Sequence, residues 1–147
     1  TLFRSSAASD VYKRQESGDA ENLNFKDNYF DLVTIGFGVR NFQDLEKGLS
    51  ESLRVLKVKG TLIVLETSVP ENRIMKLFYS IFTRTYIPIM AMIFSKDKSA
   101  YNYLLNSAEL FPSGTKFSNI LKSVGFADVL IKPKLFGSST IYVCKKK

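Results

Sequence analysis

The sequence predicts an α/β domain built on parallel strands. Two continuous apolar runs, residues 31–37 and 61–67, have the character of strands that are buried on both faces of a sheet. Between them, residues 44–57 carry leucines three and four positions apart, as on one face of an amphipathic helix. Strand, helix and strand in this order form a βαβ crossover. At 147 residues with 45% apolar side chains, the chain has the size and composition of one domain.

The first 15 residues show neither helical nor strand periodicity, and they lack the apolar core of a signal peptide. They resemble read-through of a cloning adaptor, with a disordered native tail as the alternative. We therefore expect residues 1–15 to be a non-native or disordered tail and residues 16–147 to form the domain. Without residues 1–15 the formal charge falls from +7 to +5. Because that charge is scattered, no nucleic acid partner is expected.

The crossover helix has start and stop signals at both ends. Asn41 or Asp44 is expected to cap its first turn, and residues 58–60 are expected to form the turn before the second strand.

The next segment, residues 71–94, is strongly apolar and aromatic. Lys76, Arg84 and Pro88 interrupt it, which favours two helices broken at Pro88 with an apolar face over a cleft rather than a membrane span. Residues 96–111 predict a further helix, ended by Pro112.

The last part of the chain predicts one helix and two strands. Ser113 is the expected helix cap, Leu121 and Val124 are expected to face inward, and Gly125 is the expected stop. The two strands surround Gly137 and predict an antiparallel hairpin.

The composition excludes several kinds of chemistry. The chain has no histidine, which removes Ser-His and Cys-His catalysis and the most common general base near neutral pH. Its one cysteine, Cys144, excludes an internal disulfide and fits a reducing cytoplasm. We expect no metal site and a cytoplasmic protein.

Polar residues follow both predicted parallel strands. Residues 38–41, Gly-Val-Arg-Asn, follow the first strand, and residues 66–68, Glu-Thr-Ser, end the second. Open α/β sheets bind ligands at the carboxyl ends of their strands. Arg40 and Asn41 are therefore candidate site residues, with a helix entry carrying an exposed basic residue as the alternative. No complete glycine-rich dinucleotide loop occurs, so we expect the strands that carry such a loop to lie upstream of residue 16 and to be missing.

Three stretches together resemble a known family. They are GDAENLNFKDNYFD at residues 18–31, FGVRNF at 37–42 and RVLKVKGTLIVLETS at 54–68. They look like the C-methyltransferase family of ubiquinone and menaquinone biosynthesis, and residues 95–114 and 137–142 suit the menaquinone branch. The resemblance implies a Rossmann-like class I S-adenosylmethionine-dependent methyltransferase fold without its N-terminal strands. Residues 16–147 would be a partial domain with a lid-like helical insertion over about 71–111.

The resemblance also implies a reaction. The enzyme would transfer a methyl group from S-adenosylmethionine to a ring carbon of a polyprenylated quinol, converting demethylmenaquinol to menaquinol, and this fragment alone would be inactive. Peripheral contact with the inner face of the cytoplasmic membrane and a homodimer are left open. Two alternatives remain: a methyltransferase for another apolar small molecule, and a non-catalytic basic α/β binding module.

Site residues carry over where the motif matches. Asp19 and Ala20 match a pair that lies against the adenine, and Gly36 matches a cofactor contact that glycine can make only through its backbone. Arg40 and Asn41 match the pair that faces the quinol. A guanidinium keeps its proton at physiological pH, so we expect Arg40 to stabilise the developing phenolate, while a water held by Asn41 and Asp19 removes the proton. Three tyrosines are either lining residues of the quinol pocket or packing residues: Tyr79, Tyr101 and Tyr103.

Overall fold

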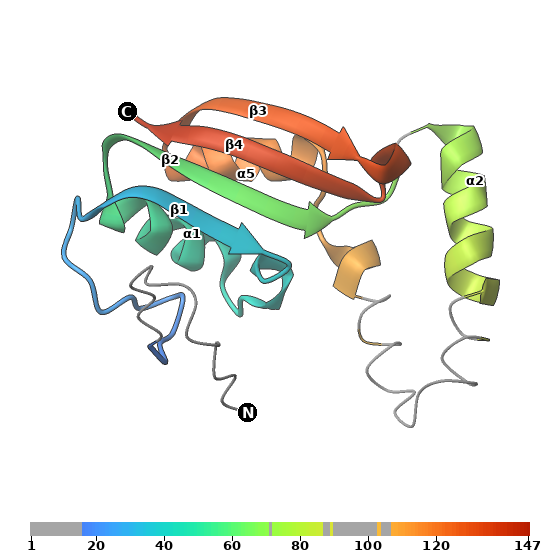
Figure 1. The fold of residues 1–147 in the computed structure, drawn as a ribbon, viewed down its shortest axis with the longest axis horizontal. Helices are drawn as coiled ribbons and strands as arrows, with labels where there is room; N and C mark the ends of the chain where they lie inside the picture. The colour runs from blue at the N-terminus through green and yellow to red at the C-terminus, as the bar shows by residue number, and fades with distance from the viewer. Residues whose placement is uncertain (1–15, 71, 87–88, 90–102, 104–106) are drawn as a thin grey trace, which may run out of the picture.

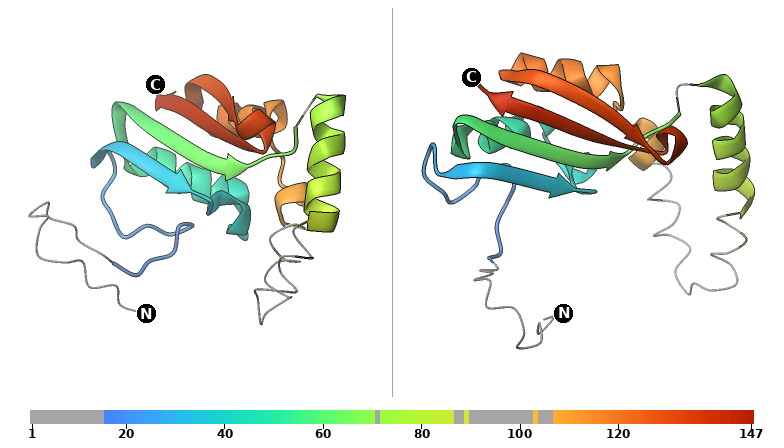
Figure 2. Two further views of the ribbon diagram at one scale, coloured as in Figure 1. Left: turned by 45° about the vertical axis from the view of Figure 1, so that its right-hand side comes forward. Right: turned by 45° about the horizontal axis from the view of Figure 1, so that its top comes forward.

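The computed structural model describes residues 16–70, 72–86, 89, 103 and 107–147 (Figure 1). Within these residues, four strands form one sheet in the order β1-β2-β4-β3. Helices α1 and α5 lie on one face of this sheet, and α2 stands beyond the end at which β1 and β2 finish (Figure 2). The predicted tail, residues 1–15, lies outside the described residues.

The predicted crossover is confirmed. Strand β1 (Phe30–Gly36) leads through a short 3-10 turn, η1 (Val39–Asn41), into helix α1 (Leu45–Val55), and the chain returns as β2 (Leu56–Thr67), parallel to β1. Asp44 caps α1, because its Oδ1 accepts a hydrogen bond from the Lys47 amide at 3.0 Å. Of the two predicted caps, Asp44 is therefore the one that the structure uses.

The predicted turn at residues 58–60 is wrong as an element boundary, because β2 begins directly after α1. The pairing passes from Phe30 with Leu56 to Leu32 with Thr61, so β2 carries extra residues that bulge out of the ladder. Lys59 takes a left-handed conformation (φ 65°) in the bulge. Gly60 is buried there, and a Cβ at this position would lie 2.7 Å from the Lys57 carbonyl oxygen.

The core lies between the sheet and the two helices on its face. Leu49 of α1 and Leu121 of α5 are fully buried against Leu62 and Val64 of β2. The opposite side chains of β2, Ile63 and Leu65, stay partly exposed, so the expectation of burial on both faces is not met within the described residues. An aromatic group extends the core around α5: Phe111, Phe117 and Tyr142.

The C-terminal elements match the prediction except at one cap. Helix α5 (Thr115–Val124) ends at Gly125 in a left-handed conformation, as expected. Its N-cap is Gly114 and not the predicted Ser113. The Gly114 amide donates to Tyr142 Oη at 2.6 Å, which ties the start of α5 to β4, and among the described residues no side-chain cap bond is present at this helix end. Leu121 is buried and Val124 is partly buried.

The predicted antiparallel hairpin is confirmed. Strand β3 (Phe126–Lys134) turns through η3 (Leu135–Gly137) into β4 (Ser139–Lys146), and β4 also pairs with β2. Because β3 runs in the same direction as β1 and β2, the turn η3 lies at the end of the sheet where β1 and β2 finish (Figure 1).

The apolar segment begins as predicted with a helix, α2 (Arg73–Ile81), which continues as a π-helical turn, η2 (Phe82–Tyr86). The predicted break at Pro88 lies outside the described residues. So does most of the helix predicted over residues 96–111, of which 107–110 are helical. Among the helices in the described part of the chain, none has the length and apolar character to cross a membrane.

Candidate functional site at the carboxyl ends of the parallel strands

Arg40 and Glu66 form an ion pair at the carboxyl ends of β1 and β2. Arg40 lies in η1, directly after β1, and its Nη1 is 2.5 Å from Oε1 of Glu66 near the end of β2. The same Nη1 donates to the Phe37 carbonyl oxygen at 3.0 Å. The crossover connection thus brings together Arg40, which follows β1, and Glu66, near the end of β2. Each residue belongs to one of the two polar clusters noted in the sequence, but their pairing was not predicted.

Glu66 is fully buried and its carboxylate is well supplied with donors. Its Oε1 accepts from the Thr67 amide at 2.8 Å and from Thr67 Oγ1 at 3.2 Å, and its Oε2 accepts from the Arg40 amide at 3.4 Å. Glu66 was not among the predicted site residues. Its position at the end of the second parallel strand was the available signal.

Among the donors of the Arg40 side chain, the buried Nε is uncommitted within the described residues. The side chain is only 10% exposed, and within the described residues its buried Nε has no hydrogen-bond partner. A buried N–H without an acceptor costs free energy, and a ligand oxygen at this position would remove the cost. The pair with Glu66 holds Nη1 and sets a carboxylate beside the guanidinium, so the Arg40 side chain is oriented at this strand end.

Asn41 lies beside Arg40 on η1 and is exposed. Its Oδ1 accepts a hydrogen bond from Tyr103 Oη at 2.9 Å, although the two residues are 62 positions apart. Arg40 and Tyr103 both line a cavity of about 420 Å³. Of the three tyrosines considered from sequence, Tyr103 is therefore the one next to the Arg40–Asn41 pair, and Tyr101 lies outside the described residues.

The segment with Asp19 and Ala20 is anchored to the entrance of α1. Oε1 of Glu21 accepts from the amides of Gln43 and Asp44 at 2.6 and 3.0 Å. Asp19 Oδ1 accepts from the Glu21 amide at 2.9 Å, which shapes the turn. The structure thus places the predicted adenine contact next to the chain that follows Asn41. Glu21, which does the anchoring, carried no distinct signal in the sequence.

Gly36 is the last residue of β1 and is exposed. An added Cβ would meet no atom within 4 Å, so the space beside it is open. Backbone contact with a ligand is therefore unobstructed at this position.

Arg54 holds the segment before β1 in place. It forms a two-bond pair with Glu51, at 2.7 and 2.8 Å, and contacts Asp27 at 2.7 Å. It also donates to the carbonyl oxygens of Leu23 and Phe25 at 2.9 and 2.8 Å. Hydrogen bonding to Arg54 lowers the pKa of Glu51, and hydrogen bonds to Glu51 and Asp27 raise the pKa of Arg54. Two of the stretches that carry the family resemblance therefore bind each other.

Two further cavities flank η3. One of about 530 Å³ has a largely apolar lining from α2, η2 and η3 that includes Phe78, Tyr79 and Phe82. Burial raises the pKa of Tyr79, and the charge of Glu109 adds to the effect.

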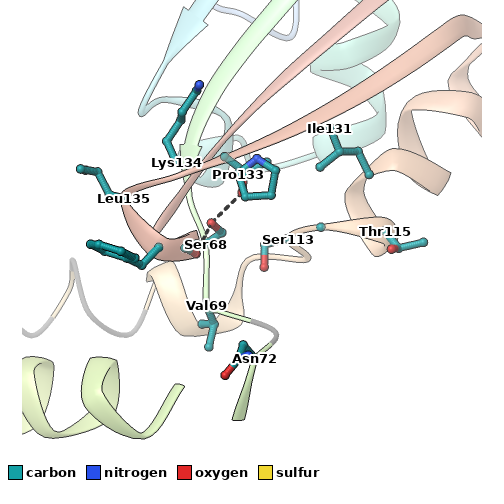
Figure 3. Close-up of a pocket in the computed structure, with 13 residues that line it drawn as sticks. Ser68, Val69, Asn72, Ser113, Thr115, Ile131, Pro133, Lys134 and Leu135 are labelled. Atoms are coloured by element: carbon teal, nitrogen blue, oxygen red, sulfur yellow. Dashed lines mark hydrogen bonds between the residues drawn. The ribbon is translucent and has the colours of Figure 1, made fainter. Parts of the chain in front are cut away.

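The other cavity, of about 610 Å³, lies between the end of β2, the hairpin and the start of α5 (Figure 3). There Ser68 Oγ donates to the Gly137 carbonyl oxygen at 2.8 Å and ties β2 to the hairpin.

No group of acidic, histidine and cysteine side chains that could hold a metal ion occurs in the described ranges.

Comparison with known proteins identifies the family. A model described as "ubiE/COQ5 methyltransferase family" matches residues 6–146. The chain belongs to this family. The resemblance inferred from the three sequence stretches is thereby confirmed, and the match starts within the segment 1–15.

Named relatives are similar over most of the chain. A "Demethylmenaquinone methyltransferase" of Bacteroides fragilis is 43% identical over 128 residues, which are 87% of this chain and 52% of the relative. One of the same name from Chlorobaculum tepidum is 43% identical over 88% of this chain and 53% of its own length. A "Ubiquinone/menaquinone biosynthesis C-methyltransferase UbiE" of Geobacter sulfurreducens is 42% identical over 89% of this chain and 51% of its own length. The chain thus spans about half the length of these relatives.

Solved structures confirm the fold class. A SAM-dependent methyltransferase from Aquifex aeolicus matches with a TM-score of 0.59 at 14% identity, covering 91% of this chain and 55% of that one. One from Thermotoga maritima matches with a TM-score of 0.57 at 21% identity, covering 88% and 62%. The sheet and its helices are therefore part of the Rossmann-like fold of these methyltransferases.

Proposed function

We propose that the protein to which this chain belongs transfers a methyl group from S-adenosylmethionine to a ring carbon of a polyprenylated quinol, converting demethylmenaquinol to menaquinol. The observation that carries the proposal is the Arg40–Glu66 pair at the carboxyl ends of two parallel strands. Family membership and the names of the Bacteroides and Chlorobaculum relatives support the menaquinone substrate. That the 147-residue chain is inactive alone stays a prediction.

The residues present fit the cofactor where they match the family motif. Asp19 offers an exposed carboxylate in an anchored turn, Ala20 is small, and Gly36 leaves open space at the end of β1. We propose that these three residues contact S-adenosylmethionine, Asp19 and Ala20 on the adenine side and Gly36 through its backbone. The bound cofactor supplies a methyl group that its sulfonium already activates, so the protein has mainly to align the substrate and exclude water.

Arg40 and Asn41 would act on the quinol hydroxyl. The hydroxyl must lose its proton before the ring carbon becomes nucleophilic, and the uncommitted Nε–H of Arg40 is a preorganised donor for the phenolate oxygen. Glu66 positions this donor by holding Nη1. A guanidinium does not serve as a base at physiological pH, so a water held by Asn41 and Asp19 is the proposed acceptor of the hydroxyl proton. After methyl transfer the methylated ring carbon would lose its hydrogen as a proton to water and the oxygen would be reprotonated, which restores the aromatic quinol. The hydrogen bond from Tyr103 to Asn41 supports a fixed orientation of that amide.

The apolar cavity beside η3 supports a prenylated substrate. Its lining is dominated by aromatic and aliphatic side chains, among them Phe78 and Phe82, at the same end of the sheet as Arg40. We propose that residues 71–111 act as a lid over the substrate. The same cavity also suits other apolar chains, so methylation of a different apolar small molecule is the second candidate. We propose that the enzyme is cytoplasmic; peripheral contact with the inner face of the cytoplasmic membrane and the homodimer stay predictions.

A completed enzyme tests the proposal. The N-terminal half of the Bacteroides relative is joined to residues 16–147, and S-adenosylmethionine binding is measured by calorimetry. Methyl transfer to a short-chain demethylmenaquinol is then followed by mass spectrometry. We expect binding and a product heavier by one methyl group. A folded chimera that binds no cofactor would rule out both methyltransferase candidates. Cofactor binding without quinol methylation would favour the second candidate.

The role of Arg40 is tested in the same chimera. Arg40→Lys keeps the charge but loses the fork of donors that binds Glu66 and the ligand together. We expect turnover to fall by about a hundredfold or more while cofactor affinity is unchanged. Near-normal turnover of Arg40→Lys would show that no oriented guanidinium is needed.

A further inference from the structure

Helix α2 exposes an apolar stripe. Its apolar side chains recur every three or four residues, and no residue of the helix is buried. The exposed fractions of these residues, together with Phe82 at the start of η2, range from 52% to 63%: Ile74, Leu77, Phe78, Ile81 and Phe82. Helices that pack on a core bury such a stripe, so this one has the character of a surface for binding.

The hairpin turn η3 adds two apolar side chains to the same end of the molecule. Leu135 is 74% exposed and Phe136 is 85% exposed. Both have positive φ, 46° and 57°, which non-glycine residues rarely adopt. The next residue, Gly137, packs closely on Pro70, because an added Cβ would lie 3.2 Å from the Pro70 Cα. The turn is therefore held in a conformation that presents the two side chains to solvent.

The stripe and the turn meet at a shared cavity. Phe78 and Phe82 of the helical segment line the same cavity as Leu135 and Phe136, and in both views of Figure 2 the turn lies beside one end of α2. We call this surface the apolar end, and it consists of the following residues: Ile74, Leu77, Phe78, Ile81, Phe82, Leu135 and Phe136.

Basic side chains lie on the same elements as the apolar end. Arg73, Lys76 and Arg84 come from α2 and η2, and the described residues 72–86 include no acidic side chain. Lys132 and Lys134 lie on β3 immediately before the turn. Glu109, at 3.8 Å from Arg84, is an acidic neighbour of this basic set. A helix with an apolar face and with basic residues among its remaining side chains is typical of helices that lie in the interface of an anionic membrane.

We propose that the apolar end docks the protein on an anionic lipid bilayer, with α2 in the plane of the interface and the η3 turn inserted beside it. The proposed function supplies only the reason for docking, which is access to a substrate dissolved in the membrane; the docking surface itself is inferred from the exposed side chains. A second copy of the chain fits this surface less well, since a two-fold contact would set the same cations against each other. The excess of positive charge selects an anionic surface instead.

Fluorescence of a single tryptophan tests the insertion. The chain contains no tryptophan, so Phe136→Trp supplies a sole reporter. Val58→Trp is the matched control: Val58 is 63% exposed and is flanked by two lysines, and it lies at the start of β2, at the other end of the sheet. We expect the emission of Trp at 136, and not at 58, to shift to the blue and to be quenched by brominated lipid in mixed phosphatidylcholine and phosphatidylglycerol vesicles.

Sedimentation with the same vesicles measures the affinity of the 147-residue chain and its variants. Leu77→Ser, at 61% exposure, should weaken binding by about tenfold or more, because one large apolar side chain leaves the lipid. Val58→Ser should have no effect. Replacing Arg73 and Lys76 by glutamine should weaken binding by about fivefold for each charge, and the same replacement of Lys57 and Lys59 should change it far less.

Each opposite result would overturn the proposal. One such result is a folded chain that does not sediment with vesicles containing phosphatidylglycerol. Another is an equal loss of vesicle binding in Leu77→Ser and Val58→Ser. A third is binding to pure phosphatidylcholine vesicles that is as strong as binding to the mixed vesicles. A blue shift of Trp at 136 that depends on protein concentration and not on lipid would assign the surface to self-association. None of these measurements requires methyl transfer, so the docking proposal can fail while the proposed reaction holds, and the reverse.

Discussion

The ion pair of Arg40 with Glu66 makes a quantitative prediction about stability. Glu66 is fully buried and Arg40 is 10% exposed, so solvent screens neither charge well. Replacing Glu66 by glutamine keeps the side-chain shape and an acceptor oxygen for the Thr67 amide, which lies 2.8 Å from Oε1. The change leaves the guanidinium buried without a counter-charge. Breaking a buried pair in this way costs about 3–5 kcal/mol of the free energy of unfolding.

The assay is urea denaturation of the 147-residue chain at neutral pH, followed by circular dichroism at 222 nm, for Glu66→Gln, Arg40→Met and the double variant. Each single variant strands one charge, whereas the double variant strands none. We therefore expect the double variant to lose less stability than the sum of the single losses, with a coupling energy of about 2 kcal/mol or more. Lys57→Gln, which breaks the exposed pair with Asp31, is the control and should change stability little.

Two results would refute the reasoning. A loss below about 1 kcal/mol for Glu66→Gln would mean that water reaches the pair and screens it. Additive single losses would mean that the two side chains stabilise the fold independently. In either case the guanidinium would not be held by Glu66, and the proposed orientation of its Nε–H toward the substrate would lose its structural basis.

Three further predictions concern other parts of the chain. Arg54 lowers the pKa of Glu51, so their pair stabilises the fold above the pKa of the unfolded glutamate, and this contribution is lost as pH falls through the folded pKa. Arg54→Gln should therefore make the free energy of unfolding depend less on pH in the acidic range. It should also speed hydrogen exchange over residues 19–28. Gly60→Ala should cost about 1–3 kcal/mol of stability in urea, while Gly36→Ala, where the added Cβ meets open space, should cost far less. Burial raises the pKa of Cys144 to about 12, so its thiol should resist Ellman's reagent at pH 8 until urea unfolds the chain; fast labelling of the native chain would contradict the burial.

Local patterns in the sequence predicted most of the secondary structure. The alternation between continuous apolar runs and leucines at helical spacing predicted β1, α1 and β2, because each element shows its period within one short window. Asp44 and Gly125 were recognisable as helix ends for the same reason, since capping acts over a few neighbouring residues. The start of β2 was misplaced, because a bulge depends on the partner strand and not on the bulged residues alone.

The candidate site was predicted only in part. Arg40 and Asn41 were candidates from the sequence, because both follow a parallel strand and such strands end at one edge of a sheet; their role in the site stays a prediction. Glu66 as the partner of Arg40, Tyr103 as the partner of Asn41 and Glu21 as the anchor of the Asp19 segment were not predicted.

The sequence alone therefore determined the order and type of the elements, the crossover, and which strand ends carry polar side chains. The tertiary structure decided which of those polar groups meet. Arg40 and Glu66 are 26 positions apart, and Asn41 and Tyr103 are 62 apart. No local propensity relates residues at such separations. The contact of Arg40 with Glu66 follows from the parallel pairing of β1 with β2, which brings the carboxyl ends of the two strands side by side.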